Sequence, residues 1–387
     1  MQVNEKERLM LEEVKIAIVG DFCPVRRLEK TIITKEYTIF NDARRALSGN
    51  DLVIANLECP LTVSRDKIKK TGPNLKADPS SVDLLNFLNI NVTALANNHI
   101  LDFGETGLLE TTKVLHENNI EFLGAGTDIE EAGKPLRINI KGTRICLFNM
   151  CEKEYSIAGE DKAGANPFDL IGVLNAVNKL RSESDVMILL YHGGIETYNL
   201  PTPEMYRNMN FLAESGLDLI VCNHQHVFSG YQKVGKCSVF YGLGNFIFDS
   251  PSKRDNPWNY GLILNLHIKG NVLRDFKLIP FEQCNGKPGI TVSSEISTRV
   301  QKELEALNLK MSVMEISREW NAYASRQQEE ILADIFIQNR YLRYILKRIK
   351  ALNLLITRQH QRRVHNYMNC ISLSELARDS LRSGIPG

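Results

Sequence analysis

The stretch NVTALANNHILDFG (91–104) places an apolar run directly before a cluster of polar side chains and a turn. Its first part, NVTALA (91–96), is typical of a buried strand, and Asn97, Asn98 and His99 follow where that strand would end. In an open α/β sheet, ligands collect beyond the carboxyl ends of the strands, so such residues are candidate site residues. A single polar residue at a strand end is usually a turn or cap residue, so the interpretation depends on whether other strands end in the same way.

Short apolar runs of this kind alternate with longer amphipathic segments between about residues 14 and 221. The alternation is typical of β-α-β units around a partly parallel sheet, so the predicted fold class is α/β. The runs are apolar at nearly every position, as in strands that are covered on both faces. The predicted strands are VKIAIV (14–19), DLVIAN (51–56), NVTALA (91–96), TRICLF (143–148), DVMILLY (185–191), LDLIVC (217–222) and CSVFYGL (237–243).

The pattern changes after Gly244. YGLILNLHIKG (260–270) and NVLRDFKLIP (271–280) alternate in polarity around a Gly-Asn turn, which predicts a hairpin. From about Glu295 the chain has no strand pattern and carries apolar residues at helical spacing. These changes predict a main domain over residues 1–290 and a helical, basic C-terminal appendage over residues 291–387.

Composition limits the function classes without choosing one. Apolar residues make up 43% of the 387, so a disordered chain is excluded, and 47 Lys and Arg nearly balance 46 Asp and Glu, so net charge indicates no partner. The eight cysteines form no C-x-x-C pair, which favours reduced thiols in the cytoplasm. No apolar run approaches the roughly 18 residues of a membrane span, and the N-terminal run is too short for a signal peptide, so we expect neither secretion nor a transmembrane anchor.

Five predicted strands end in residues that can bind metal ions. Together they bring two carboxylates, an amide pair and four imidazoles to one rim, and packing alone gives no reason for this recurrence. The residues are Asp21; Glu58; Asn97, Asn98 and His99; His192; and Asn223, His224, Gln225 and His226.

Mixed His, carboxylate and Asn ligands fit Zn²⁺, Mn²⁺ or Fe²⁺ better than an all-oxygen Mg²⁺ or Ca²⁺ site. Six ligands suffice for two divalent transition-metal ions (Mn, Fe or Zn) that share a bridging carboxylate. Two ions roughly 3.5–4 Å apart activate a water molecule, which is hydrolytic chemistry. His99 and Asp102 are three residues apart at a turn before a helix, so the carboxylate can fix the imidazole and His99 can protonate a leaving group.

The same residues carry a family resemblance that covers about residues 14–280. In this order and spacing, the chain resembles the CapA family of bacterial capsule and poly-γ-glutamate synthesis proteins, within the calcineurin-like metallophosphoesterase superfamily. The blocks are Gly20-Asp21, Asn56-Leu57-Glu58, Ala96-Asn97-Asn98-His99 with Asp102 and Gly104, His192-Gly193-Gly194 with Glu196, His224-Gln225-His226-Val227, and Gly242-Leu243-Gly244-Asn245-Phe246 with Asp249.

The resemblance implies a four-layer α/β sandwich with a dinuclear site, and a catalytic role for residues 1–290. Glu58 would be the bridging ligand, and His99 would be the general acid, oriented by Asp102. Glu196, Tyr241 and Asn245 would lie near the substrate. The implied metal ligands are Asp21, Glu58, Asn98, His192, His224 and His226.

The chain departs from related patterns at three places. The wider superfamily has Asp-x-His at the first strand, whereas this chain has Asp21-Phe22-Cys23, and members of the CapA family also lack that histidine. Cys23 could supply a thiolate ligand or could be a buried inert thiol. Gly193 stands where the family usually has Trp, and Cys222-Asn223 stands where it usually has Gly-His, which would alter the pocket wall. Many relatives are anchored in a membrane, whereas we expect no anchor here.

The C-terminal appendage is basic between Arg340 and Arg363, with apolar residues interleaved at helical spacing and no acidic residue. Such a helix can lie on an anionic membrane surface or bind a polyanionic glycan. It can also pack on the main domain with its basic face in solvent. No nucleic acid is expected as a partner, because no recognised motif supports it. The basic residues are Arg340, Arg343, Lys347, Arg348, Lys350, Arg358, Arg362 and Arg363.

Three functions remain compatible with the sequence. The leading hypothesis is a metal-dependent hydrolase of a small-molecule or polymer-linked phosphoester in capsule, cell-surface polymer or related glycan biosynthesis. The first alternative is a non-catalytic subunit that binds a polymer or a synthase. The second is a metal-dependent amidase that acts on γ-glutamyl bonds, since a metal-activated hydroxide can attack either centre.

Overall fold

The computed structural model describes residues 12–337, 339–349, 357–370, 373–374 and 377. The chain forms two compact units, Met1–Ile316 and Ser317–Gly387. The division falls later than residue 290, because helix α9 (Ser294–Asn308) packs on strand β15 (Val272–Gln283) of the first unit. The prediction of a catalytic domain over residues 1–290 concerns function, so this division does not test it.

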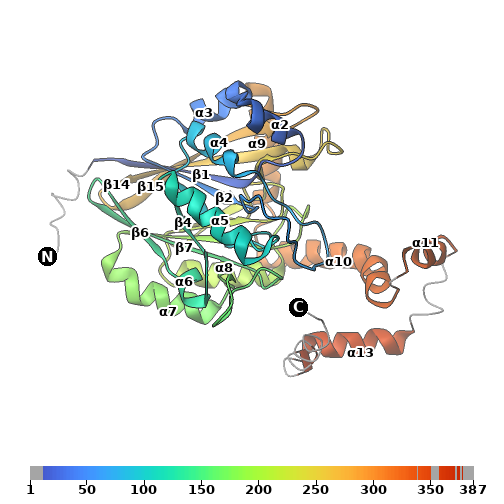
Figure 1. Ribbon diagram of the computed structural model, residues 1–387. Coiled ribbons are helices and arrows are strands. Elements are labelled where there is room, and N and C mark those ends of the chain that lie inside the picture. Colours follow the sequence, from blue (N-terminus) through green and yellow to red (C-terminus); the bar gives the residue numbers. More distant parts are fainter. Residues whose placement is uncertain (1–11, 338, 350–356, 371–372, 375–376, 378–387) are drawn as a thin grey trace. The chain divides into compact units, whose positions relative to one another are not determined.

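The first unit contains two large β-sheets that lie face to face (Figure 1). Among the described residues, the first sheet has eight strands in the order β16-β15-β14-β1-β2-β3-β4, with β13 paired to β1. Strands β1 to β4 are parallel, whereas β14 is antiparallel to β1. Their bounds are β1 Val14–Cys23, β2 Leu52–Leu57, β3 Val92–Ala94, β4 Glu121–Leu123, β13 Asn245–Phe248, β14 Tyr260–Lys269, β15 Val272–Gln283 and β16 Ile290–Thr291.

The second sheet has six strands among the described residues, in the order β11-β12-β10-β9-β7-β6. Its central strands β7, β9, β10 and β12 are parallel to their neighbours in this group, and β6 and β11 are antiparallel edge strands. A small sheet of β5 (Ala125–Gly126) and β8 (Gly164–Ala165) accompanies them. The bounds are β6 Leu136–Ile140, β7 Thr143–Cys151, β9 Val186–His192, β10 Leu219–Asn223, β11 Tyr231–Val234 and β12 Cys237–Phe240.

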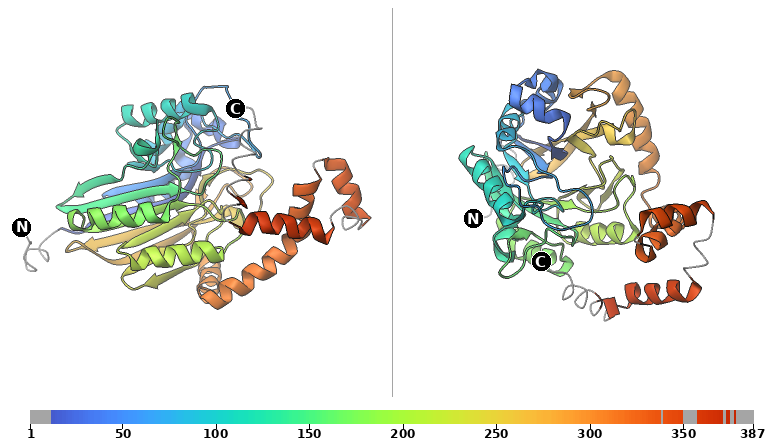
Figure 2. Two further views of the ribbon diagram at one scale, coloured as in Figure 1. Left: turned by 90° about the horizontal axis from the view of Figure 1, so that it is seen from below. Right: turned by 45° about the vertical axis from the view of Figure 1, so that its right-hand side comes forward.

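Helices cover the outer sides of both sheets (Figure 2). Apolar residues on the helices pack inward; in α8, for example, Met205, Met209 and Leu212 are buried, whereas Phe211 is exposed. The predicted four-layer α/β sandwich of the metallophosphoesterase type is thereby confirmed, as is the hairpin of β14 and β15. The helices of this unit are α2 Arg27–Thr34, α3 Asn41–Leu47, α4 Val82–Phe87, α5 Gly104–Glu117, α6 Ile129–Ala132, α7 Leu170–Leu180, α8 Pro203–Glu214 and α9 Ser294–Asn308.

The chain passes from the second sheet to the first between β12 and β13, and this crossing shapes the site. Gly244 has a φ of 73°, a conformation that favours glycine, and its carbonyl oxygen would lie 1.8 Å from a Cβ on Gly20. Two glycines are therefore required for this close approach. The crossing ends β12 at Phe240, earlier than predicted, and aligns Asn245 with Asp21 in the β1–β13 pair.

The second unit is helical, as predicted for the C-terminal region. Its described helices include most of α10 (Val313–Phe336), α11 (Arg340–Arg348) and α13 (Arg358–Asn369). Ala333 and Ile337 form a small buried cluster with Leu346 of α11 packed against it. Of the predicted basic residues, Lys350 lies outside the described residues.

Candidate metal centre

The polar residues at the predicted strand ends come together, but at the meeting point of two sheets rather than at the rim of one. Strands β1, β2 and β3 of the first sheet bring Asp21, Glu58 and Asn98. Strands β9 and β10 of the second sheet bring His192 and the segment that follows Asn223. The sequence pattern identifies the strand ends without revealing that they belong to different sheets.

Glu58 lies at the centre of this group. Its side chain is fully buried, and neither carboxylate oxygen has a hydrogen-bond partner among the described residues. Burial, and next the charge of Asp21, raise the pKa of Glu58 well above its usual value. An unpaired buried carboxylate is costly unless a cation compensates it. The donor atoms around Glu58 therefore fit bound metal ions.

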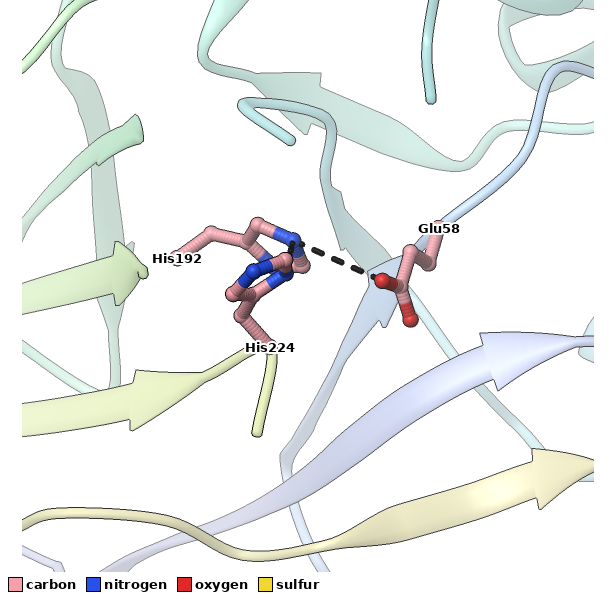
Figure 3. A group of neighbouring side chains, drawn as sticks. All are labelled: Glu58, His192 and His224. Carbon is pink, nitrogen blue, oxygen red and sulfur yellow. Dashed lines mark hydrogen bonds and ion pairs between the residues drawn. The ribbon is translucent and has the colours of Figure 1, made fainter. Parts of the chain in front are cut away.

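One set of donors surrounds the Nε2 atom of His192 (Figure 3). This atom lies 3.1 Å from Asn98 Oδ1, 3.1 Å from His224 Nδ1 and 3.5 Å from Glu58 Oε1. Ligands bound at about 2.1 Å in a tetrahedron are about 3.4 Å apart, so the spacing suits a single ion. We call Glu58, Asn98, His192 and His224 the histidine-rich group.

The two imidazoles of the histidine-rich group are held in their neutral form. Burial lowers the pKa of His192 well below its usual value, and it lowers the pKa of His224 to about 3. A neutral imidazole has one ring nitrogen with a free lone pair, as coordination of a metal ion requires. The environment thus prepares these rings for coordination.

A second set of donors surrounds the Nδ1 atom of His226. It lies 3.3 Å from Asp21 Oδ2 and 3.7 Å from Glu58 Oε2, and all three side chains are buried. The amide nitrogen of Asn56 donates to Asp21 Oδ1 at 2.7 Å, which leaves Oδ2 directed at His226. We call Asp21, Glu58 and His226 the carboxylate-rich group, and it shares Glu58 with the histidine-rich group.

The backbone that presents the histidines after β10 is unusual. His224 has a φ of 97° and His226 a φ of 59°, in the left-handed region that non-glycine residues rarely adopt. Such conformations persist where the surrounding structure enforces them, and they cluster at functional sites. The ring of His226 is also fixed by packing against Trp258 at 4.6 Å and Phe248 at 5.1 Å between ring centroids.

His99 and Asp102 form the predicted pair. His99 Nδ1 lies 2.6 Å from Asp102 Oδ2, and the carboxylate also accepts a hydrogen bond from the backbone N–H of Leu75. With Nδ1–H donating to Asp102, Nε2 remains as the ring nitrogen available to a substrate. The pair therefore has the geometry of an oriented proton donor.

Lys70 is a residue of this site that the sequence analysis did not identify. Its side chain is only 3% exposed, and its ammonium group forms an ion pair with Asp102. It also lies 3.1 Å from His99 Nδ1 and 3.4 Å from the carbonyl oxygen of Asn98. The loop that contains it has several lysines and no periodicity, so only the three-dimensional structure shows which lysine turns inward.

The three residues expected near the substrate differ in position. Glu196 is exposed in the loop after β9, and its charge raises the pKa of Glu58, so it lies near the cluster. Asn245 is fully buried beside His226. Tyr241 is directed elsewhere, because its hydroxyl accepts hydrogen bonds from the amides of Asn210 and Gln232. The structure does not bring Tyr241 to the metal cluster.

The departures from the family pattern have structural counterparts. A Cβ on Gly193 would lie 2.6 Å from Glu152 Cγ and 2.7 Å from the hydroxyl of Tyr191, so these side chains occupy the space beside Gly193. Cys23 is fully buried, and burial together with neighbouring Cys59 raises the pKa of its thiol well above the usual value. That environment favours an inert thiol over a thiolate ligand.

Comparisons with known proteins identify the family of this chain. A family profile described as "Bacterial capsule synthesis protein PGA_cap" matches residues 15–250. The "Capsule biosynthesis protein CapA" of Bacillus anthracis is 26% identical over 304 residues, which cover 76% of this chain and 73% of that protein. The "PGA biosynthesis protein CapA" of Bacillus subtilis (strain 168) is 26% identical over 272 residues, which cover 69% and 70%.

More distant relatives carry related descriptions. A "Probable polyglutamine synthesis accessory protein" of Mycobacterium tuberculosis is 24% identical over 217 residues, covering 52% of this chain and 57% of that protein. A solved structure of a phosphatase from Mycoplasma pneumoniae has a TM-score of 0.44 at 15% identity, covering 76% of this chain and 100% of that one. No described helix is both long and apolar enough to cross a membrane. With more than half of its residues matched, the chain belongs to the PGA_cap family of bacterial capsule synthesis proteins, the family of CapA.

Proposed function

We propose that the protein is a metal-dependent hydrolase that cleaves phosphoesters in capsule, cell-surface polymer or related glycan biosynthesis. The observation that carries this proposal is the unpaired carboxylate of Glu58, buried between two sets of neutral or anionic donor atoms. A site that had lost its ions would have no reason to keep this costly arrangement. The catalytic domain would comprise residues 1–290, and the helical appendage residues 291–387.

Two divalent ions (Mn, Fe or Zn) fit the donor atoms. The histidine-rich group would hold one ion and the carboxylate-rich group the other, with Glu58 as the shared ligand. When bound, the ions supply an activated water molecule and neutralise charge on a phosphoryl oxygen. The mixed N and O donor set matches transition metals better than Mg²⁺ or Ca²⁺.

His99 would supply the proton in this reaction. As the bond between phosphorus and the leaving oxygen breaks, that oxygen takes a proton from Nε2 of a His99 ring that enters the step protonated on both nitrogens, while Asp102 accepts the hydrogen bond from Nδ1–H. Lys70 keeps the Asp102 carboxylate ion-paired within the buried site. These side chains therefore orient one proton donor beside the metal cluster.

The substrate would be a small-molecule or polymer-linked phosphoester. Glu196 and Glu154 lie at the cluster's edge, since both raise the pKa of Glu58, and Glu154 Oε1 is 3.9 Å from His224 Nε2. Carboxylates at this edge favour neutral or cationic groups on the part of the substrate beyond the phosphoryl group. Glu152 fills the wall at Gly193 and changes the pocket relative to relatives with Trp.

Two alternatives use the same fold. The M. tuberculosis relative is described as an accessory protein, which favours a non-catalytic subunit that binds a polymer or a synthase. The resemblance to poly-γ-glutamate synthesis proteins favours an amidase that acts on γ-glutamyl bonds through the same donor atoms. The retained donor set is an argument against the first alternative, because a non-catalytic subunit would not need it. Assays with phosphoester and γ-glutamyl substrates are needed to separate the amidase from a phosphoesterase.

We also propose a cytoplasmic protein that contacts an anionic surface through helix α11. Its eight free cysteines, seven of them buried, are typical of a reducing compartment. On α11, Tyr341 and Ile345 are exposed beside Arg348, a combination that suits an anionic membrane surface. A polyanionic glycan would use the arginine alone, so replacing Ile345 by Ser separates the two partners.

The function is tested by parallel assays of a phosphomonoester, a phosphodiester and a γ-glutamyl amide with protein loaded with Mn²⁺ or Zn²⁺. We expect phosphoester turnover that falls about 10²–10⁴-fold in His99→Ala, the usual contribution of a positioned acid. Turnover of the γ-glutamyl amide alone would establish the amidase. No turnover of any substrate by metal-loaded protein would favour the accessory subunit.

A further inference from the structure

Asn245 lies close to the carboxylate-rich group. It is fully buried, and its Oδ1 atom is 3.0 Å from His226 Nδ1. The parallel pairing of β1 with β13 places it directly opposite Asp21. Asn245 is therefore held at the level of the metal ligands by the sheet itself.

The orientation of the Asn245 amide is fixed. Its Nδ2 donates to the backbone carbonyl oxygens of His226 at 3.0 Å and of Trp258 at 3.2 Å. Because carbonyl oxygens only accept hydrogen bonds, the amide nitrogen must face them and the amide oxygen must face His226 Nδ1. A carbonyl oxygen directed at a cluster of metal-binding atoms is a suitable ligand for a divalent ion.

The two donor groups become equivalent when Asn245 is included. Around His192 Nε2, three donors lie at 3.1, 3.1 and 3.5 Å. Around His226 Nδ1, Asn245 Oδ1, Asp21 Oδ2 and Glu58 Oε2 lie at 3.0, 3.3 and 3.7 Å. In both sets, the distances lie on either side of the value of about 3.4 Å expected between two ligands of one tetrahedral ion.

We propose that Asn245 Oδ1 is the fourth protein ligand of the carboxylate-rich site, in the place of the histidine that Asp-x-His supplies elsewhere in the superfamily. The inference rests on the proposed metal centre and adds a ligand to it. Cys23 occupies the position of the missing histidine in the sequence, but it is fully buried beside Cys59. An amide oxygen therefore completes the site, and the thiol does not.

The test is metal binding by the purified full-length chain, measured by elemental mass spectrometry and by titration with Co²⁺. The variants are Asn245→Leu, which removes the oxygen at similar size, and Cys23→Ser, the matched control for the rival ligand. We expect two equivalents in the wild type and in Cys23→Ser, and one in Asn245→Leu. The Co²⁺ protein should show no sulfur-to-metal charge-transfer absorption in the near ultraviolet.

Folding is checked separately, because Asn245 also supports the backbone at His226 and Trp258. Circular dichroism of each variant in chelator establishes whether its fold is kept, and Asn245→Asp provides a second variant that restores an oxygen ligand. It should bind two equivalents where Asn245→Leu binds one. Two equivalents in Asn245→Leu at unchanged affinity, or loss of one in Cys23→Ser with sulfur absorption in the wild type, would overturn the inference alone. A wild type that binds no metal would remove both the inference and the proposed function.

Discussion

The histidine-rich and carboxylate-rich groups share Glu58, yet they differ in how their donors are supplied. The histidine-rich group takes Asn98, His192 and His224 directly from strand ends in both sheets. The carboxylate-rich group takes Asp21 from β1 and His226 from the left-handed segment that also presents His224, and Cys23 stands two residues after Asp21. Both groups use a histidine in the left-handed segment after β10, and they differ in that only the carboxylate-rich group lies beside the crossing that pairs β13 with β1.

The difference shows what each layer of structure contributes. Within each sheet, parallel pairing brings neighbouring strand ends to one edge, and the packing of the two sheets then brings those edges together. The carboxylate-rich group needs Gly20 and Gly244 to bring β13 against β1, and aromatic packing on His226 to hold the ring. We expect this group to tolerate fewer changes in its surroundings.

Replacing Glu58 should remove metal binding at both groups, because both contain this residue. In Glu58→Gln, we expect loss of both metal equivalents and of phosphoester turnover. The metal-free variant should unfold at a higher temperature than the metal-free wild type, because the unpaired buried charge is removed. Metal analysis and thermal unfolding in chelator measure the two effects, and Glu117→Gln, at the exposed end of α5, serves as the control. Retention of both ions in Glu58→Gln would show that Glu58 is not the shared ligand.

Single histidine changes should separate the two groups. His224→Ala should lose the ion of the histidine-rich group, and His226→Ala that of the carboxylate-rich group, each falling from two equivalents to one. His267→Ala, on the partly exposed face of β14, should keep both. Elemental analysis after dialysis makes the measurement. If either variant lost both ions, the two sites would be a single cooperative unit.

Lys70 contacts the side chains of the His99–Asp102 pair, so its replacement should separate turnover from metal binding. Lys70→Met should leave both ions bound, yet lower kcat by about 10–100-fold, as changes behind a functional side chain do. The reason is that Asp102 loses its ion pair and no longer fixes His99. Lys69→Met, at the exposed neighbouring position, should change neither metal binding nor kcat. Partial recovery in Lys70→Arg would show that the positive charge matters, whereas unchanged kcat in Lys70→Met would exclude a role.

The smallest expected effect is the pH dependence of metal stabilisation. In the folded metal-free protein, burial raises the pKa of Glu58 above its value in the unfolded chain. Glu58 therefore contributes to stability at a pH below its unfolded pKa, and this contribution is lost as the pH rises through the folded pKa. It lowers the pKa of His224 to about 3, so that contribution is present above about pH 6.5 and is lost as the pH falls toward 3. Metal requires both groups unprotonated, so its stabilising effect should grow from about pH 5 to about pH 8. Thermal unfolding with Mn²⁺ and with chelator checks this, and a gain that shrinks with pH would contradict it.

Much of the site could be predicted from the sequence because its residues follow apolar strands. Asp21, Glu58, Asn98, His192 and the His224–His226 pair each adjoin a run whose pattern predicts a strand, and the structure brings them together. Parallel strand ends turn such a local pattern into a spatial one. The α/β fold and its four layers followed from the alternation of runs and from the family resemblance.

The remaining features depend on contacts between distant segments. Lys70 lies in an irregular loop, and only its burial against Asp102 distinguishes it from Lys69. Tyr241 follows a strand like the candidate ligands, but its hydroxyl accepts a hydrogen bond from Asn210 on α8. No local pattern encodes such contacts, so these positions could not be derived from the sequence.

Anomalous diffraction from crystals grown with Mn²⁺ shows whether two ions share Glu58. We expect two peaks roughly 3.5–4 Å apart. One should lie among Glu58, Asn98, His192 and His224, and the other among Asp21, Glu58, His226 and Asn245. If no peak appeared in this cluster at saturating Mn²⁺, or if a single peak appeared that Glu58 does not contact, then Glu58 would not be a ligand shared by two ions.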